Sequence, residues 1–306
     1  MHSISKQDKS FRQEIEFKEI PNEALCDEAP IEQARSLKTK VKTLFKEKVR
    51  TTWETKPLHG KFVERIKEPN VEKHLSNLWL RSAALKAETE GFIMAAQDQA
   101  LPTRNYLKNI SKTCPDDLCR LCKNQKETID HLVAGCSMIA PTEYLARHNK
   151  VASYVHYKIC EASGIKVPEK WYDHSPDAVT ENKNLTILWD FSVHTDREVK
   201  ANRPDIIIKD KVNKKCLLID IAVPADKNIS VKEFEKISKY KNLEIEIQRM
   251  WNLQTKTVPV VIGALGVISK DFKEHLEKLP GELEINELQK ITLLGTAHIL
   301  RRVLTP

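Results

Sequence analysis

Residues 203–224, RPDIIIKDKVNKKCLLIDIAVP, contain two apolar runs separated by a polar loop. The runs at 204–209 and 216–223 are rich in isoleucine, leucine and valine, which is typical of buried strands. The charged loop between them predicts a β-hairpin. Asp205 opens the first run, and Asp220 lies inside the second. The pattern therefore places a carboxylate where the chain should be buried.

Two aspartates on a hairpin can share one divalent cation, and hard oxygen ligands suit Mg²⁺ or Mn²⁺. We therefore expect Asp205 and Asp220 to hold such an ion, which can activate water beside a scissile phosphate. The alternative is structural: Asp205 begins a turn, and Asp220 is a buried acid paired with a lysine. Some cation is expected in either case, because burying an unpaired carboxylate is costly.

A nuclease site of this kind also needs a lysine near the acids. Restriction-type motifs often place it two residues after the second acid, but Ala222 stands there. The predicted helix at 230–251 offers Lys232, Lys236 and Lys239. Lys236 and Lys239 are three residues apart and therefore share a helix face.

A second aspartate pair imitates the motif. Asp177 follows a proline, and Asp190 comes later within the predicted strand at 186–193. The polar stretch AVTENKN after Asp177 is poorly suited to a buried strand. We rank Asp205 and Asp220 first and keep Asp190 as an accessory residue.

The hydrophobic pattern divides the rest of the chain into predicted helical and strand-rich parts. Residues 31–50 and 71–100 have apolar positions at helical spacing, and a further helix is expected to follow the cysteine-rich loop and stop at Gly164. Residues 257–265 indicate another buried strand, followed by two helices. The predicted fold class is α/β (mixed α+β), with a mixed sheet flanked by helices. The expected domains are a helical basic region at 1–113, a cysteine-rich module with its helix at 114–170, and the sheet domain at 171–306.

Four residues have the spacing of a structural zinc site: Cys119, Cys122, His131 and Cys136. A Cys-x2-Cys turn can direct two thiolates to one point, and a histidine and cysteine five apart can complete a tetrahedron. The alternative, buried free cysteines and a surface histidine, is less compatible with this order. Cys114 is left over.

The 306 residues are 41% hydrophobic and 30% charged, as in globular proteins, and carry a net charge of +7. Between residues 35 and 50 there are seven basic residues and one acid. Lys38 and Lys42 of this stripe are candidate phosphate contacts; a solvated helix face is the alternative. We find no signal peptide, no apolar run long enough to span a membrane and no Gly-rich nucleotide loop. The expected location is intracellular.

Taken in order, these motifs resemble the C-terminal portion of non-LTR retrotransposon polyproteins that carry a restriction-like endonuclease. In that family a CCHC knuckle follows the reverse transcriptase. An Arg-His-Asn/Asp element comes next, then Arg/Lys-Pro-Asp with a second acid twelve to fourteen residues later. The matching elements here are the knuckle at 119–136, RHN at 147–149, RPD at 203–205 and Asp220. The resemblance covers roughly residues 50–306, and no polymerase motif is present.

The resemblance implies a PD-(D/E)xK fold and metal-dependent nicking of target DNA, whose 3′-hydroxyl would prime reverse transcription. It implies structural Zn²⁺, catalytic Mg²⁺ or Mn²⁺, a nuclear or nucleo-cytoplasmic location, and element RNA or a reverse transcriptase in trans as further partners. An inactive nucleic-acid-binding relic, using the knuckle and basic helices, is the alternative. The implied site residues are Asp205, Asp220, Lys236, Lys239 and Tyr240 for catalysis, Asp190 and Arg203 as accessories, and Arg147, His148 and Asn149 for positioning DNA.

Overall fold

The computed structural model describes residues 30–56 and 58–305, with side chains from residue 35 onward. The chain divides into two units at Trp53/Glu54. The N-terminal stretch that argues against a signal peptide lies outside the described residues. Within the described ranges, no helix has the length and hydrophobicity needed to cross a membrane.

Helix α2 (Pro30–Glu54) confirms the helix expected at 31–50. Lys38 and Lys42 are exposed on it, as contact with a polyanion would require. Leu44 on the same helix is 61% exposed, so the apolar stripe is also open to solvent.

Five strands of the described chain form one sheet in the order β1-β2-β3-β4-β5. Strands β1 to β4 are antiparallel neighbours, and β5 pairs with β4 in parallel. The hairpin and the mixed α/β class are thereby confirmed. The strands are β1 (Val179–Glu181), β2 (Leu185–Trp189), β3 (Ile206–Asp210), β4 (Lys215–Ala222) and β5 (Gln254–Val261).

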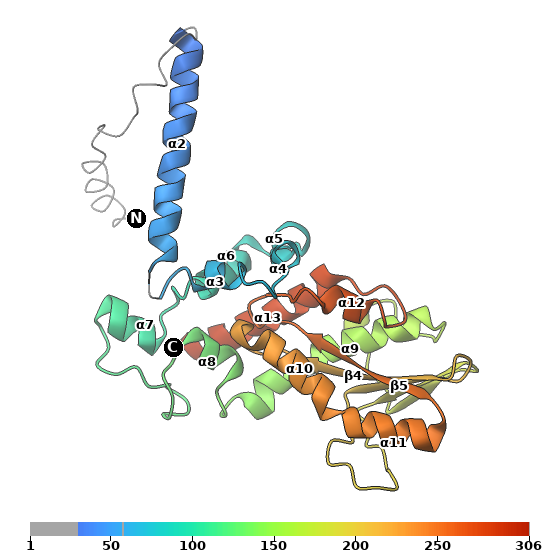
Figure 1. The fold of residues 1–306 in the computed structure, drawn as a ribbon. Coiled ribbons are helices and arrows are strands. Elements are labelled where there is room, and N and C mark those ends of the chain that lie inside the picture. The colour runs from blue at the N-terminus through green and yellow to red at the C-terminus, as the bar shows by residue number, and fades with distance from the viewer. Residues whose placement is uncertain (1–29, 57, 306) are drawn as a thin grey trace. The chain divides into compact units, whose positions relative to one another are not determined.

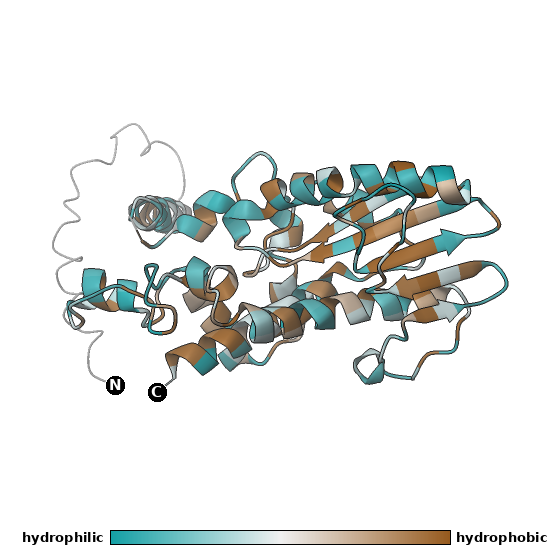
Figure 2. Cartoon of the chain, turned by 90° about the horizontal axis from the view of Figure 1, so that it is seen from below, coloured by the Kyte–Doolittle hydropathy of each residue, from teal (hydrophilic) through white to brown (hydrophobic). Residues whose placement is uncertain are grey.

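Helices cover both faces of the sheet (Figure 1). Alternate strand residues, such as Ile219 and Ile221, pack in one core with α9, α12 and α13. The intervening residues, such as Leu218, pack in a second core with Leu243 and Ile247 of α11. Figure 2 shows the strands mainly in the hydrophobic colour between these layers. These helices are α9 (Leu145–Ala162), α10 (Ile229–Lys239), α11 (Lys241–Trp251), α12 (Phe272–Leu276) and α13 (Ile285–Leu304).

The segment before the sheet is built from short helical pieces. The helical pattern at 71–100 is realised as α4, α5 and α6. The α-helices of the segment are α3 (Lys61–Arg65), α4 (Lys73–Ser76), α5 (Trp79–Ser82), α6 (Ala87–Gln97), α7 (Arg104–Tyr106) and α8 (Ile129–Ala134). The remaining short turns of helix in the described chain are Leu107–Ser111, Ala140–Tyr144, Trp171–Asp173 and Asp226–Asn228.

Two local predictions differ from the structure. The helix expected at 230–251 is two helices, because Tyr240 leaves helical geometry at φ −102° and ψ 7°. The polar stretch after Asp177 does form a strand, β1. It lies at the edge of the sheet, where Val179 is 50% exposed, so its polar composition causes no burial cost.

The cysteine-rich module and the sheet region share packing. Cys119 and Cys136 lie in a core cluster with Ala96 of α6, Leu265 after β5 and Leu300 of α13. From Glu54 onward the chain forms one compact unit. The boundaries expected at 113 and 170 lie within this unit and stay predictions.

Gly281 and Gly91 provide a matched test of this packing. Gly281 has φ +90°, and an added Cβ would lie 2.8 Å from Ala162 Cβ at the end of α9. Gly281→Ala should destabilise the protein by about 2 to 3 kcal/mol, because left-handed strain and steric overlap add. Gly91→Ala, in the open middle of α6, should stabilise it by about 1 kcal/mol. Urea denaturation measures both, and equal effects of the two variants would contradict the packing described.

Candidate carboxylate site and zinc knuckle

The four knuckle residues bring their ligand atoms to one point. Sγ of Cys119, Cys122 and Cys136 and a ring nitrogen of His131 all lie within 4.8 Å of one another. Cys119 Sγ is 3.9 Å from Cys136 Sγ, and Cys122 Sγ is 3.4 Å from His131 Nε2. Tetrahedral zinc places such ligands about 3.5 Å apart. The donor set and its spacing fit a structural zinc ion.

The backbone around the knuckle explains this convergence. Cys119 N donates to Gln125 O at 2.7 Å, and Lys123 N donates to Cys119 O at 3.0 Å. Lys123 has φ 58°, which tightens the turn. Thr128 then caps α8, because its Oγ1 accepts a hydrogen bond from His131 N at 3.1 Å. The turn and the cap together direct both halves of the ligand set inward.

Outer contacts orient the ligands. His131 Nδ1 lies 3.1 Å from Gln125 Oε1, so a proton on Nδ1 leaves the Nε2 lone pair facing Cys122. The Tyr144 hydroxyl accepts from Cys136 N at 3.1 Å and lies 2.9 Å from Leu132 O. Burial raises the pKa of the Cys136 thiol to about 11, so a bound cation is needed to keep it as thiolate at neutral pH.

Asp220 is the centre of the carboxylate site. It is 2% exposed and lies on β4, on the face covered by α10 and α11. Its Oδ2 forms an ion pair with Lys236 Nζ, and Lys239 Nζ lies 3.7 Å from its Oδ1. The Tyr240 hydroxyl donates to Oδ1 at 2.5 Å and accepts from Lys239 Nζ at 2.7 Å. The structure therefore brings together four of the five residues predicted for catalysis.

Asp205, the fifth, lies one residue before β3. Ile206 pairs with Ile219, so the antiparallel register continues to Asp205 opposite Asp220. Asp205 Oδ2 accepts from Ile221 N at 2.6 Å and lies 3.1 Å from His148 Nε2. The hairpin thus places Asp205, just before β3, opposite Asp220 of β4.

Nearby charges set the ionisation of these groups. Burial opposes ionisation of Asp205, but the hydrogen bond and charge of His148 outweigh it and lower the Asp205 pKa. Burial likewise opposes protonation of His148, yet contact with Asp205 leaves the His148 pKa above its ordinary value. Burial, then the charge of Asp220, raises the pKa of Tyr240. Tyr240 therefore remains a hydroxyl donor at neutral pH.

The accessory residues lie at the edge of the site. Asp190 N donates to Asp205 O at 2.8 Å, which places Asp190 next to the carboxylate pair in the backbone. Its carboxylate forms an ion pair with the Arg203 guanidinium at 2.6 Å, and both side chains are more than half exposed. Arg203 O lies 3.1 Å from the Tyr240 hydroxyl. Asp190 therefore faces Arg203 rather than the buried acid.

The RHN element is divided between core and site. Arg147 is 3% exposed and donates to Thr296 Oγ1 at 2.8 Å and to Val133 O at 2.7 Å. This corrects the placement expected for Arg147, because a guanidinium enclosed by α8 and α13 has no surface for DNA. His148 faces Asp205, and Asn149 Oδ1 lies 3.1 Å from His148 Nδ1.

Sequence reasoning missed the contact between His148 and Asp205. The two residues are 57 positions apart, and no local spacing connects them. The only signal was the presence of histidine in the RHN element itself.

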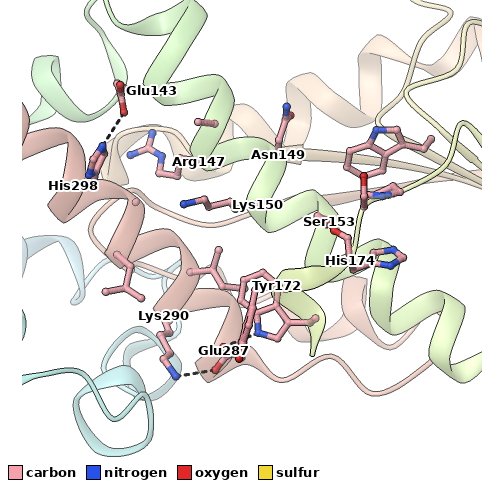
Figure 3. Close-up of a pocket in the computed structure, with 18 residues that line it drawn as sticks. Glu143, Arg147, Asn149, Lys150, Ser153, Tyr172, His174, Glu287, Lys290 and His298 are labelled. Carbon is pink, nitrogen blue, oxygen red and sulfur yellow. Dashed lines mark hydrogen bonds and ion pairs between the residues drawn. The ribbon is translucent and has the colours of Figure 1, made fainter. Parts of the chain in front are cut away.

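Asn149 also lines a pocket of about 670 Å³ between α9, the turn at Trp171–Asp173 and α13 (Figure 3).

Comparison with known proteins bears on the knuckle. Residues 43–141 match the model of a family described as zinc-binding in reverse transcriptase. This match supports a relationship between this chain and proteins related to retrotransposon reverse transcriptases. The matched range contains all four knuckle residues and ends before Arg147, so it does not cover the carboxylate site. A search of curated proteins finds no match to the chain.

Loss of zinc should destabilise the whole unit from Glu54 onward, because Cys119 and Cys136 lie in its shared core. We expect Cys119→Ser, or treatment with a zinc chelator, to lower the melting temperature by roughly 10 °C or more. Circular dichroism melts measure this. Cys114→Ser is the matched control, since Cys114 lies outside the ligand cluster. An unchanged melting temperature for Cys119→Ser would exclude a structural metal here.

The His148–Asp205 pair predicts a pH dependence. The lowered Asp205 pKa contributes stability above pH 3.8 that is lost as pH falls through its folded pKa. The raised His148 pKa contributes stability below pH 6.5 that is lost as pH rises through its folded pKa. His148→Gln should therefore cost about 1 to 2 kcal/mol near pH 5.5 and less near pH 8.5. Denaturation at both pH values measures this.

The control for this test is His148→Gln in the Asp205→Asn background. Without the carboxylate, the pH-dependent part of the loss should disappear. If the difference between the two pH values persisted in that background, another group would be responsible.

Proposed function

We propose that this protein is a divalent-metal-dependent DNA endonuclease of the restriction-like, non-LTR retrotransposon type, which nicks a target strand. The observation that carries the proposal is that Asp205, just before β3, lies opposite Asp220 of β4, with Lys236 and Lys239 directed at Asp220 from α10. Two acids and a lysine at one end of a mixed sheet are the groups that such a reaction requires. The motif order along the chain supports the same conclusion.

Asp205 and Asp220 are the residues that would hold a magnesium or manganese ion. Asp205 and Asp220 offer hard carboxylate oxygens from two strands, and a cation already contacts Asp220 in the form of Lys236. When bound, such an ion supplies Lewis acidity and charge neutralisation at a phosphate. The Lys236 side chain is 20% exposed, so it has a path towards solvent when it gives up Asp220 Oδ2.

The chain's own residues then have separate roles. Lys236 is the catalytic lysine that neutralises the developing charge on the phosphate and orients the attacking water. Lys239 and Tyr240 hold Asp220 Oδ1 in place. His148 holds Asp205 ionised and oriented. The site thus positions both acids before a substrate arrives, which reduces the reorganisation needed during the reaction.

DNA is the proposed partner, with element RNA and a reverse transcriptase in trans as further partners, and the nucleus as the site of action. The exposed Lys38 and Lys42 on α2 would contact phosphates, and Asn149 lies near the carboxylate site. Binding through lysines releases counterions, so affinity should fall steeply with salt concentration.

The proposal is tested by nicking of supercoiled plasmid DNA with Mg²⁺ or Mn²⁺. Asp220→Asn should reduce the nicking rate by roughly a thousandfold or more, because the ion loses a buried ligand. Asp177→Asn, an exposed aspartate of the imitating motif, should cut like the wild type. Cutting by Asp220→Asn at the wild-type rate would refute the assignment.

A substitution at Lys236 distinguishes an effect on the nicking rate from an effect on metal binding. Lys236→Met should slow nicking by roughly a hundredfold, the usual cost of one lost charge-stabilising donor. It should bind Mn²⁺ at least as tightly as the wild type, because the competing ammonium on Asp220 is gone. Calorimetric titration measures that affinity.

If the wild type bound DNA in a salt-sensitive way but did not cut it with metal present, the alternative function, an inactive nucleic-acid-binding protein, would be favoured.

A further inference from the structure

Helix α9 carries a histidine and a cysteine on one buried face, away from both sites described above. His156 and Cys160 are four residues apart, which places their side chains one above the other on a helix. His156 is 0% and Cys160 is 1% exposed. Cys160 Sγ lies 3.5 Å from His156 Nδ1.

A third donor comes from the turn that precedes β1. His174 follows the helical turn Trp171–Asp173, and its Nε2 lies 2.8 Å from His156 Nδ1. Ser153, one turn earlier on α9, donates to His174 O at 3.2 Å and so fixes the turn against the helix. Ligand atoms of all three side chains lie within 4.8 Å of one another.

We propose that His156, Cys160 and His174 form a second zinc site, separate from the knuckle. The donor set of two imidazoles and one thiolate is one that zinc prefers. A histidine and a cysteine four apart on a helix present both donors to one side, as metal-binding helices do. The third ligand, from a distant turn, closes the group from the other side.

One of the two close donor distances already suits this ion, and the other requires a small shift. Zinc bonds of about 2.3 Å to sulfur and 2.0 Å to nitrogen place tetrahedral S and N donors about 3.5 Å apart and two N donors about 3.3 Å apart. The Cys160–His156 separation already has this value. The two imidazole nitrogens, at 2.8 Å, must separate by about 0.5 Å. His174 lies on a turn and is only partly buried, so it can move by this amount.

The site would have an open side. His174 lines the pocket of about 670 Å³ and lies beside Ser153 in Figure 3. Three protein ligands leave a fourth position, which water from the pocket can occupy. Trp189 of β2 lines the same pocket and packs edge-on against His156 at 5.6 Å between ring centroids. The ion would tie α9 to the turn before β1, beside the sheet.

Metal content per chain tests the proposal directly. The full chain, purified with zinc present, should contain two zinc ions by elemental analysis, one of them in the knuckle. Cys160→Ala should reduce the content to one. The matched control is Cys216→Ala, another fully buried cysteine, on β4 and outside both clusters, which should keep two. With Co²⁺ in place of zinc, the thiolate-to-cobalt absorption should fall in the Cys160 variant alone.

His174→Gln provides a second variant in case the buried Cys160→Ala fails to fold. It lies on a partly exposed turn and should also reduce the zinc content from two ions to one. The proposal is overturned if the wild type contains a single zinc that disappears in Cys119→Ser. It is equally overturned if both Cys160→Ala and His174→Gln retain two ions.

Discussion

The buried carboxylate of Asp220 is the constraint on which the sheet domain depends. A carboxylate that is 2% exposed must find positive charge and hydrogen-bond donors, because leaving it bare would cost several kcal/mol. Lys236, Lys239 and Tyr240 provide them from the junction of α10 and α11. Lys236 near the end of α10 and Tyr240 at its junction with α11 therefore lie beside Asp220 of β4. The groups that satisfy the charge in the fold are those that the proposed reaction would use.

The zinc knuckle depends on the rest of its unit as much as on its own ligands. Glu127 is fully buried behind the knuckle, and its carboxylate forms an ion pair with Arg120 at 2.8 Å. The same guanidinium donates to Val303 O at 3.1 Å, at the end of α13. Arg120 thus links the knuckle segment to the C-terminal helix α13 by an ion pair and a hydrogen bond. The segment that matches the zinc-binding family therefore packs in one core with residues of the C-terminal part of the chain.

Neighbouring residues on α9 have different environments because a helix turns by about 100° per residue. Arg147 points into the core between α8 and α13, where it bonds a threonine and backbone carbonyls. His148 points to the carboxylate site and contacts Asp205. Two turns further on, His156 and Cys160 are buried against the turn that carries His174. One helix therefore connects the core, the carboxylate pair and the second donor cluster.

The sequence by itself determined the hairpin around Asp220, the four knuckle ligands and the mixed α/β class, because these depend on local periodicity and short spacings. It also indicated Lys236 and Lys239 on the following helix, which the structure shows beside Asp220. Only the tertiary structure decided that Arg147 is buried, that His148 meets Asp205 and that the helix ends before Tyr240. Those contacts join segments far apart in the chain, and their free energies come from burial and charge pairing that no short window of sequence contains.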